Sequence, residues 1–204
     1  VIYLPEIWNC HCGFDFERKE NPPPFINNKY FTFGSFNNPS KMTDNVLNCW
    51  SNILKKVKGS KLIIKCSSKK RKFDRIEKIF KKNGVLDSVT FYYRIDKLED
   101  HLNLYRKIDV ALDTFPYNGV TTSFEAIWMG VPVLTMAGYN FNSRCGESIN
   151  KNLNMEQLIA KDEDDYVDKA VNLSNNHNEY ISLRKFVFTD STESPLFNRK
   201  KFSE

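Results

Sequence analysis

Apolar residues follow two patterns along the chain: a periodic spacing that predicts helices, and short continuous runs that predict strands. Between Asp44 and Val57 the apolar residues recur every three or four positions, which is typical of an amphipathic helix. Thr43 is expected to cap this helix, because its hydroxyl can accept a free N–H of the first turn. Short apolar runs such as Leu62–Ile64 indicate strands that are buried on both faces. The pattern therefore predicts an alternation of strands and helices.

The same reasoning assigns elements to the rest of the chain. Strands are expected at Tyr30–Phe36, Leu62–Ile64, Val89–Tyr93, Val110–Leu112 and Val131–Thr135, with a weaker one at Leu158–Ala160. Further helices are expected at Phe73–Phe80 (with Gly84 as its C-terminal cap), Leu98–Tyr105, Thr121–Met129, Tyr166–Leu173 and Tyr180–Leu183. Strands that alternate with helices at this spacing imply parallel βαβ units. Residues 30–204 are therefore predicted to form an α/β fold with a doubly wound parallel sheet.

Residues 1–29 show neither the apolar spacing of a helix nor that of a strand. They are aromatic and apolar at first and then contain the run Pro22-Pro23-Pro24. Such a segment is typical of a connection and not of a folding unit. Because the chain begins with Val1 and not with Met, we expect this segment to arrive from an upstream part of a longer protein.

Composition narrows the class of protein. The 204 residues are 41% hydrophobic and 27% charged, as in an ordinary globular domain. No apolar run is long enough to cross a bilayer, and no signal pattern is present, so a cytoplasmic location is expected. The five cysteines are scattered and odd in number, which suggests reduced thiols. The spacing of Cys10-His11-Cys12 is too tight for a usual zinc knuckle, and no metal site is predicted.

Charge adds little to this picture. The net charge is +5, and the densest basic cluster is KCSSKKRK at residues 65–72. No aromatic residues interleave with these charges, which favours a solvated loop over a nucleic-acid or membrane surface. We therefore expect neither nucleic acid nor membrane as a partner.

The segment from Asp109 to Gly138 carries the most chemistry. It reads as a strand that stops at Asp113, a turn-rich loop, a helix and a second strand. Gly119 and the hydroxyl residues Thr121 and Thr122 stand where the helix must begin. Free backbone N–H groups and the positive end of the helix dipole favour a phosphate there. The segment predicts a site for a nucleoside diphosphate.

Other polar residues are expected beyond the carboxyl ends of the strands, where ligands bind in open parallel sheets. Lys41 precedes a helix start, His101 precedes the fourth strand, and Glu125 lies one turn into the helix at Thr121. Singly, each has an ordinary structural explanation, as a solvated, a packed or a dipole-complementing residue. Tyr117 and Asn118 lie in the loop expected to face the ligand, and the sequence leaves their contact with it open. A dehydrogenase is excluded because G-x-G-x-x-G is missing, and the P-loop is missing too.

Taken together, these segments resemble a known family. The motifs are GSFNNPSK at residues 34–41, HLNLYRKIDVALDTFPYNGVTTSFEAIWMGVPVLTMAG at 101–138, LIAKDEDDYV at 158–167 and SPLFN at 194–198. They are similar to the C-terminal catalytic half of the O-linked N-acetylglucosamine transferase family, in its SPINDLY-like and bacterial branch. The resemblance covers Phe33 to Phe197 and implies the second, Rossmann-like lobe of a GT-B glycosyltransferase. Upstream tetratricopeptide repeats and the first lobe would hold the protein acceptor.

The resemblance also implies roles for individual residues. Lys41 would be the catalytic lysine that neutralises the departing diphosphate. Six residues would bind the nucleotide sugar: Asn38 at the phosphates, His101 beside the nucleotide, Gly119, Thr121 and Thr122 at the diphosphate, and Glu125 at the ribose hydroxyls.

The implied reaction is an inverting, metal-independent transfer of N-acetylglucosamine from UDP-N-acetylglucosamine to serine or threonine, without a cofactor. One departure concerns the donor: Val120 stands where metazoan members have a histidine. The plant SPINDLY protein also lacks this histidine and uses GDP-fucose, so an O-fucosyltransferase is the alternative. A third reading is a module that binds a nucleotide sugar without turning it over. The lobe alone is expected to be inactive, because half of the cleft would be missing.

Overall fold

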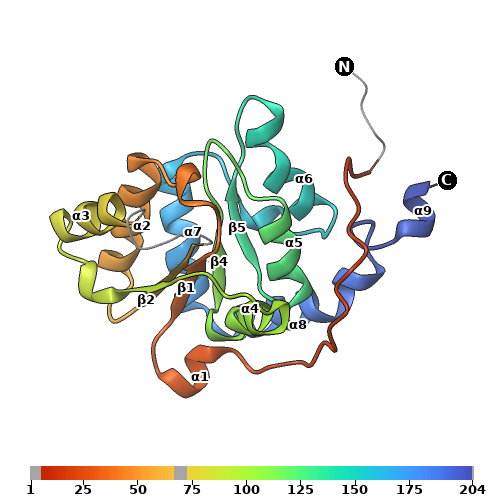
Figure 1. Cartoon of the computed structure of the whole chain (residues 1–204), viewed down its shortest axis with the longest axis horizontal. Helices are drawn as coiled ribbons and strands as arrows, with labels where there is room; N and C mark the ends of the chain where they lie inside the picture. Colours follow the sequence, from red (N-terminus) through yellow and green to blue (C-terminus); the bar gives the residue numbers. More distant parts are fainter. Residues whose placement is uncertain (1–5, 67–72, 204) are drawn as a thin grey trace.

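The computed structural model describes residues 6–66 and 73–203, which contain a single parallel sheet flanked by helices (Figure 1). The strand order is β3-β2-β1-β4-β5-β6, and every pair of neighbours is parallel. The strands are β1 (Thr32–Ser35), β2 (Lys61–Lys65), β3 (Val89–Tyr92), β4 (Val110–Leu112), β5 (Val133–Met136) and β6 (Ile159–Ala160). The prediction of a doubly wound parallel α/β fold is confirmed.

Most of the helices also lie where the apolar rhythm predicts them. They are α1 (Pro24–Asn28), α2 (Asp44–Lys56), α3 (Asp74–Lys82), α4 (Leu98–Leu104), α5 (Thr121–Trp128), α6 (Cys145–Lys151), α7 (Glu163–Asn175), α8 (His177–Asp190) and α9 (Arg199–Ser203). Thr43 caps α2 as expected, since its Oγ1 accepts from Val46 N at 3.4 Å. Gly84 follows α3 with φ +72°, a left-handed conformation that suits glycine. The helices α1, α6 and α9, of five to seven residues, were not predicted from the sequence.

The helices form a layer on each face of the sheet. Helices α2, α3 and α7 cover one face, and α4, α5 and α6 cover the other (Figure 1). Alternate residues of each central strand join opposite cores: Leu62 and Ile64 of β2 pack on one side, and Ile63 packs on the other. This is why the central strands read as uninterrupted apolar runs in the sequence.

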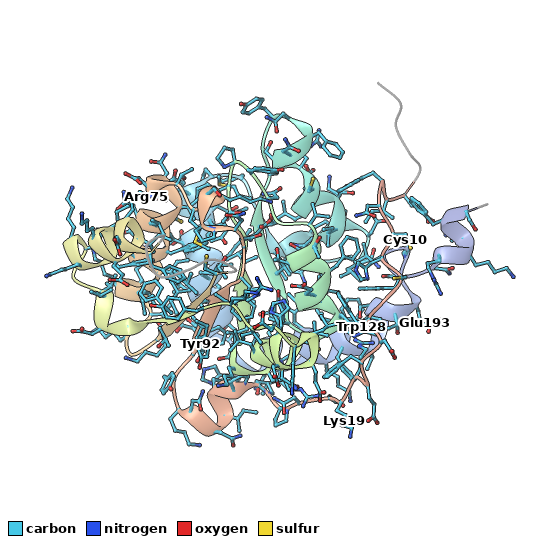
Figure 2. All side chains as sticks on the ribbon, viewed as in Figure 1. Cys10, Lys19, Arg75, Tyr92, Trp128 and Glu193 are labelled. Atoms are coloured by element: carbon cyan, nitrogen blue, oxygen red, sulfur yellow. The ribbon has the colours of Figure 1, made fainter. Side chains whose placement is uncertain are left out.

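The segment before α1 is irregular, as expected, but it is packed along the lobe. In Figure 1 it runs past α5 and α8 towards α1, and Figure 2 shows Trp128 beside it. The Arg18 side chain donates to Trp128 O at 2.6 Å and to Phe188 O at 2.7 Å, and His11 N donates to Leu196 O at 2.8 Å. Residues 24–28, which were included in the predicted connecting segment, form the helix α1.

The strand order sets the position of the site. From β1 the chain continues to β2 on one side, whereas β4 continues to β5 on the other. The loops at the carboxyl ends of β1 and β4 therefore diverge and leave a crevice between them, the usual place for a ligand in such sheets. The loop after β1 carries Asn38 and Lys41, and the loop after β4 carries Gly119 and leads into α5.

Candidate functional site

A cavity of about 410 Å³ lies at this crevice. Four of the predicted site residues line it: Asn38, Lys41, Thr121 and Thr122. The other lining residues come from the same loops, from the loop between β5 and α6, and from the N-terminal segment: Trp8, Asn37, Tyr117, Val120, Phe141, Asn142 and Cys145. Residues that are far apart in sequence thus meet where the topology places a ligand.

Lys41 is held at the cavity by the loop after β4. Its Nζ donates to Asn118 O at 2.8 Å and lies 3.9 Å from the centre of the Tyr117 ring. Burial lowers the pKa of Lys41, and the negative charge of Asp113 opposes this shift. An ammonium group has three N–H donors, and the bond to Asn118 uses one of them. Lys41 can therefore offer positive charge and further donors to an anion.

Asn38 begins the short turn that presents Lys41. Its Oδ1 accepts from Ser40 N at 3.1 Å and from Ser40 Oγ at 2.6 Å, and it caps the 3₁₀ turn Pro39–Lys41. The residue is exposed at the cavity wall, so it both shapes the turn and faces the cavity.

A buried carboxylate organises the loop after β4. Asp113 Oδ1 accepts from Gly119 N at 2.6 Å, Thr114 N at 2.8 Å and Asn37 Nδ2 at 3.2 Å. Its Oδ2 accepts from Thr135 Oγ1 at 2.8 Å. Burial raises the pKa of Asp113 to about 6, although these hydrogen bonds act in the opposite direction. From the sequence, Asp113 was predicted only to end a strand; a charged residue directly after a fully apolar strand was the available signal.

The turn at Gly119 leaves no room for a side chain. A Cβ there would lie 2.5 Å from Thr122 Oγ1 and 2.6 Å from Asn37 Oδ1. Thr122 Oγ1 itself donates to Asn37 Oδ1 at 2.7 Å, which ties the start of α5 to the loop after β1. Val120 stands at the N-cap position of α5, where no side chain caps the helix. The first turn of α5 thus has N–H groups that suit an anion.

His101 and Glu125 form a second cluster beside the cavity. His101 Nε2 lies 2.9 Å from Glu125 Oε2, and Tyr105 OH donates to the same oxygen at 2.8 Å. Burial, the charge of Glu125 and this hydrogen bond raise the pKa of Tyr105 well above its usual value. Tyr105 OH also lies 3.2 Å from Thr122 O, so the cluster adjoins the cavity at Thr122. Tyr105 was not among the predicted site residues, although it lies four residues after His101.

The structure separates the two loop residues that the sequence left open. Asn118 is fully buried: its Nδ2 donates to Thr114 O at 2.9 Å, and its Oδ1 accepts from Gly146 N at 3.1 Å. Its backbone N donates to Asn142 O at 2.9 Å. Tyr117 is 49% exposed and lines the cavity. Tyr117 is therefore available to a ligand, and the Asn118 side chain is used within the protein.

Other sequence features have structural partners or lie outside the described part. His11 Nδ1 accepts from Gly13 N at 3.0 Å, and its ring packs on Phe14 and Phe124. Residues 67–72 of the basic cluster are outside the described residues. Within residues 6–66 and 73–203, no group of three or more His, Cys, Asp or Glu is placed to hold a metal ion. Within the same ranges, no helix has the length and apolar character needed to span a bilayer.

Comparisons with known proteins agree on one family. The family model described as glycosyl transferase family 41 matches residues 25–204. A curated relative is the probable UDP-N-acetylglucosamine–peptide N-acetylglucosaminyltransferase SPINDLY of Solanum lycopersicum, which is 35% identical over 210 residues. This match covers 100% of the chain and 22% of the relative, so the chain spans about a fifth of the length of that protein.

Solved structures support the fold and the relationship. An O-GlcNAc transferase mutant of Thermobaculum terrenum superposes with a TM-score of 0.74 at 30% identity, covering 78% of this chain and 31% of that one. WaaG, a glycosyltransferase involved in lipopolysaccharide biosynthesis, superposes with a TM-score of 0.64 at 16% identity, covering 88% of this chain and 48% of the other. The second likeness concerns the fold alone.

Proposed function

Since this chain belongs to glycosyl transferase family 41, we propose that it is the donor-binding lobe of a GT-B enzyme that transfers N-acetylglucosamine from UDP-N-acetylglucosamine to serine or threonine side chains of proteins. The observation that carries the proposal is the cavity at the crevice between β1 and β4, which brings together Lys41, Thr121 and Thr122. The similarity to the tomato relative, which is named as a peptide glycosyltransferase, supports a protein acceptor.

The chemistry follows from these residues. The bond between the anomeric carbon and the β-phosphate oxygen breaks, and negative charge builds on the diphosphate. The Lys41 ammonium and the N–H groups at the start of α5 stabilise that charge more in the transition state than in the ground state. The acceptor oxygen attacks from the opposite face and inverts the anomeric centre, and its proton passes to a base. Because a cation and a helix start face the leaving group, the proposal requires no metal ion.

The remaining parts of the reaction belong to a larger protein. We propose that a first lobe closes over this cavity, and that upstream tetratricopeptide repeats help to hold the acceptor. The short span of the chain relative to its curated relatives supports this division. The donor thus binds here, and acceptor selection rests mainly on the other parts.

A second donor is favoured by one residue. Val120 lines the cavity at the N-cap position of α5 and offers no polar side chain to the diphosphate or the sugar. The plant SPINDLY protein also lacks the metazoan histidine at this place. GDP-fucose is therefore the alternative donor, with the same roles for Lys41 and Thr122.

Calorimetric titration with UDP, GDP and their sugar conjugates tests the proposal, together with transfer assays on the full-length protein. Lys41→Ala is expected to reduce transfer by roughly 10²–10³-fold while donor binding is only weakened. Lys58→Ala, at an exposed lysine after α2 that does not line the cavity, is the matched control. Preference for UDP supports the N-acetylglucosamine donor, and preference for GDP supports the alternative. Unchanged transfer by Lys41→Ala would refute the catalytic role of this lysine.

A further inference from the structure

Three aromatic side chains contribute to the lining of the cavity. Trp8, Tyr117 and Phe141 all line it, and the Trp8 and Phe141 rings meet edge to face with their centroids 4.8 Å apart. Phe141 is 61% exposed and Tyr117 49%, which is unusual for side chains whose burial stabilises a fold. We call these three residues the aromatic wall. Exposed aromatic rings in the lining of a cavity offer a ligand an apolar surface.

The groups that share the cavity with these rings indicate which part of the ligand they contact. Lys41 and Thr121 line the same cavity, and the proposed function puts the diphosphate at these two residues. The cluster of His101 and Glu125 adjoins the cavity at Thr122 but does not line it. In a nucleotide sugar the diphosphate separates the nucleoside from the sugar. With the nucleoside beside His101, the other end of the donor reaches the aromatic wall.

The wall is fixed before any ligand arrives. Phe141 begins the 3₁₀ turn Phe141–Ser143, which is closed by a reciprocal pair of bonds: Ser143 N donates to Asn140 Oδ1, and Asn140 N donates to Ser143 Oγ, each at 3.0 Å. Asn118 N donates to Asn142 O at 2.9 Å, which fastens this turn to the loop that holds Lys41. A ligand therefore meets a preorganised surface, and little conformational entropy is lost on binding.

We propose that the aromatic wall receives the sugar ring of the donor and selects which sugar is transferred; this inference rests on the proposed function. A pyranose has faces made of C–H groups, and these pack on the faces and edges of aromatic rings. Its hydroxyl groups point from the edges and need polar partners, and Asn142, the residue after Phe141, lines the same cavity. Tyr117 also contacts Lys41, so the wall adjoins the charge that stabilises the leaving group.

The test compares ligands with and without the sugar. Calorimetry with UDP and UDP-N-acetylglucosamine, and with GDP and GDP-fucose, is run on the unmodified protein and on Phe141→Ala. We expect Phe141→Ala to bind the free diphosphate unchanged and the sugar conjugate about tenfold more weakly. Tyr139→Ala is the matched control, because Tyr139 lies in the same loop, is 88% exposed and does not line the cavity. It should leave both affinities unchanged.

The outcomes separate this inference from the proposed function. If Phe141→Ala weakens the diphosphate and the conjugate equally, or neither, the wall does not hold the sugar and the inference fails. If only the KM for the acceptor peptide rises, the wall serves the acceptor and the inference also fails. If neither nucleotide binds the unmodified protein, the proposed function itself fails. Phe141→Leu, which keeps an apolar side chain without the ring, should show the same selective loss and guards against a folding defect in the alanine variant.

Discussion

A buried aspartate flanks strand β4 at each end, and the two aspartates hold different parts of the protein. Asp109 precedes the strand and Asp113 follows it. Neither is appreciably exposed, and burial raises the pKa of both carboxyls to about 6. Asp109 and Asp113 therefore flank the same strand, are both buried and both have a raised pKa. They differ in the groups that donate hydrogen bonds to them.

At the amino end, all partners belong to packed elements. The Asp109 carboxylate accepts from Thr32 N at 2.8 Å and from Phe25 N at 3.2 Å, which joins β1 and α1 to β4. Its backbone oxygen accepts from Tyr180 OH at 2.7 Å and from Arg184 Nη1 at 3.1 Å, both on α8. This network holds secondary structure together and includes a cation.

At the carboxyl end, the partners include the loops that line or support the cavity, beside Thr135 of β5 and Tyr166 of α7. The Asp113 carboxylate holds Gly119 and Asn37, and Tyr166 OH donates to its backbone oxygen at 2.9 Å. Among the described residues, no lysine or arginine donates a hydrogen bond to this carboxylate. The comparison teaches that a buried acid with a raised pKa does not by itself mark a site; the elements that it positions do.

The largest effects are expected when each of the two carboxylates is removed. Asp109→Ala and Asp113→Ala each leave buried donors without an acceptor, so each is expected to lower the free energy of unfolding by about 3 kcal/mol. Only Asp113→Ala should also lose donor binding, because it releases the turn at Gly119. Denaturant unfolding and calorimetry with UDP, at a temperature where both variants are folded, make the measurement. Equal loss of binding in the two variants would contradict the division between the ends of β4.

The next test uses pH. A carboxyl with a pKa of about 6 in the folded protein and 3.8 when unfolded binds a proton more readily in the folded state. Its stabilising contribution is complete below about pH 4 and is lost as pH rises through about 6, a change of about 3 kcal/mol. Asp113→Asn cannot titrate, so the free energy of unfolding of the unmodified protein minus that of the variant should fall over this range. Parallel stability curves for the two proteins would refute the raised pKa.

A smaller effect is expected from a single methyl group. Gly119→Ala places a Cβ against Thr122 and Asn37, and such overpacking costs about 1–3 kcal/mol. Because the clash lies between the two loops of the site, donor affinity should fall as well. The control is Gly84→Ala, where φ is +72° and no atom lies within 4 Å of the added Cβ. That variant should lose about 1 kcal/mol of stability through its backbone and keep its donor affinity, as calorimetry can check.

The smallest effects are expected from two hydroxyl deletions, one at each end of β4. Tyr180→Phe removes the donor to Asp109 O, and Tyr166→Phe removes the donor to Asp113 O. Each variant is expected to lose about 1 kcal/mol of stability, because a buried hydroxyl donor is removed from its acceptors. Donor affinity should change slightly in Tyr166→Phe only. A larger loss of affinity in Tyr180→Phe would show that the amino end of β4 also shapes the cavity.

The fold could be predicted from the sequence because the spacing of apolar residues follows directly from which side chains are buried. The continuous run at Leu62–Ile64 and the periodic faces of α2 and α5 reflect two cores on opposite faces of one sheet. The residues proposed to bind phosphate could also be expected at one edge of the sheet, because loops after parallel strands converge there. Thr121, Thr122 and Lys41 do lie at one cavity.

The unpredicted features depend on contacts between distant residues. Asp113 looked like the end of a strand, because its acceptor role depends on how Asn37 and Thr135 pack around it. Trp8 and Phe141 are separated by more than half of the chain, so no spacing could indicate that their rings meet. Local pattern specifies elements and strand-end loops, whereas side-chain networks follow from the packed structure.

Asn118 has a consequence for how such a lobe can evolve. Its carbonyl accepts from Lys41, its amide side chain joins Thr114 to Gly146, and its backbone N–H reaches Asn142. A substitution there would remove the two side-chain bonds that hold the loop carrying the acceptor of Lys41, so a lineage that changes its donor has to do so elsewhere. The side chains of Tyr117 and Val120 line the cavity. Divergence of sugar preference is therefore expected to accumulate at these two positions, on either side of Asn118.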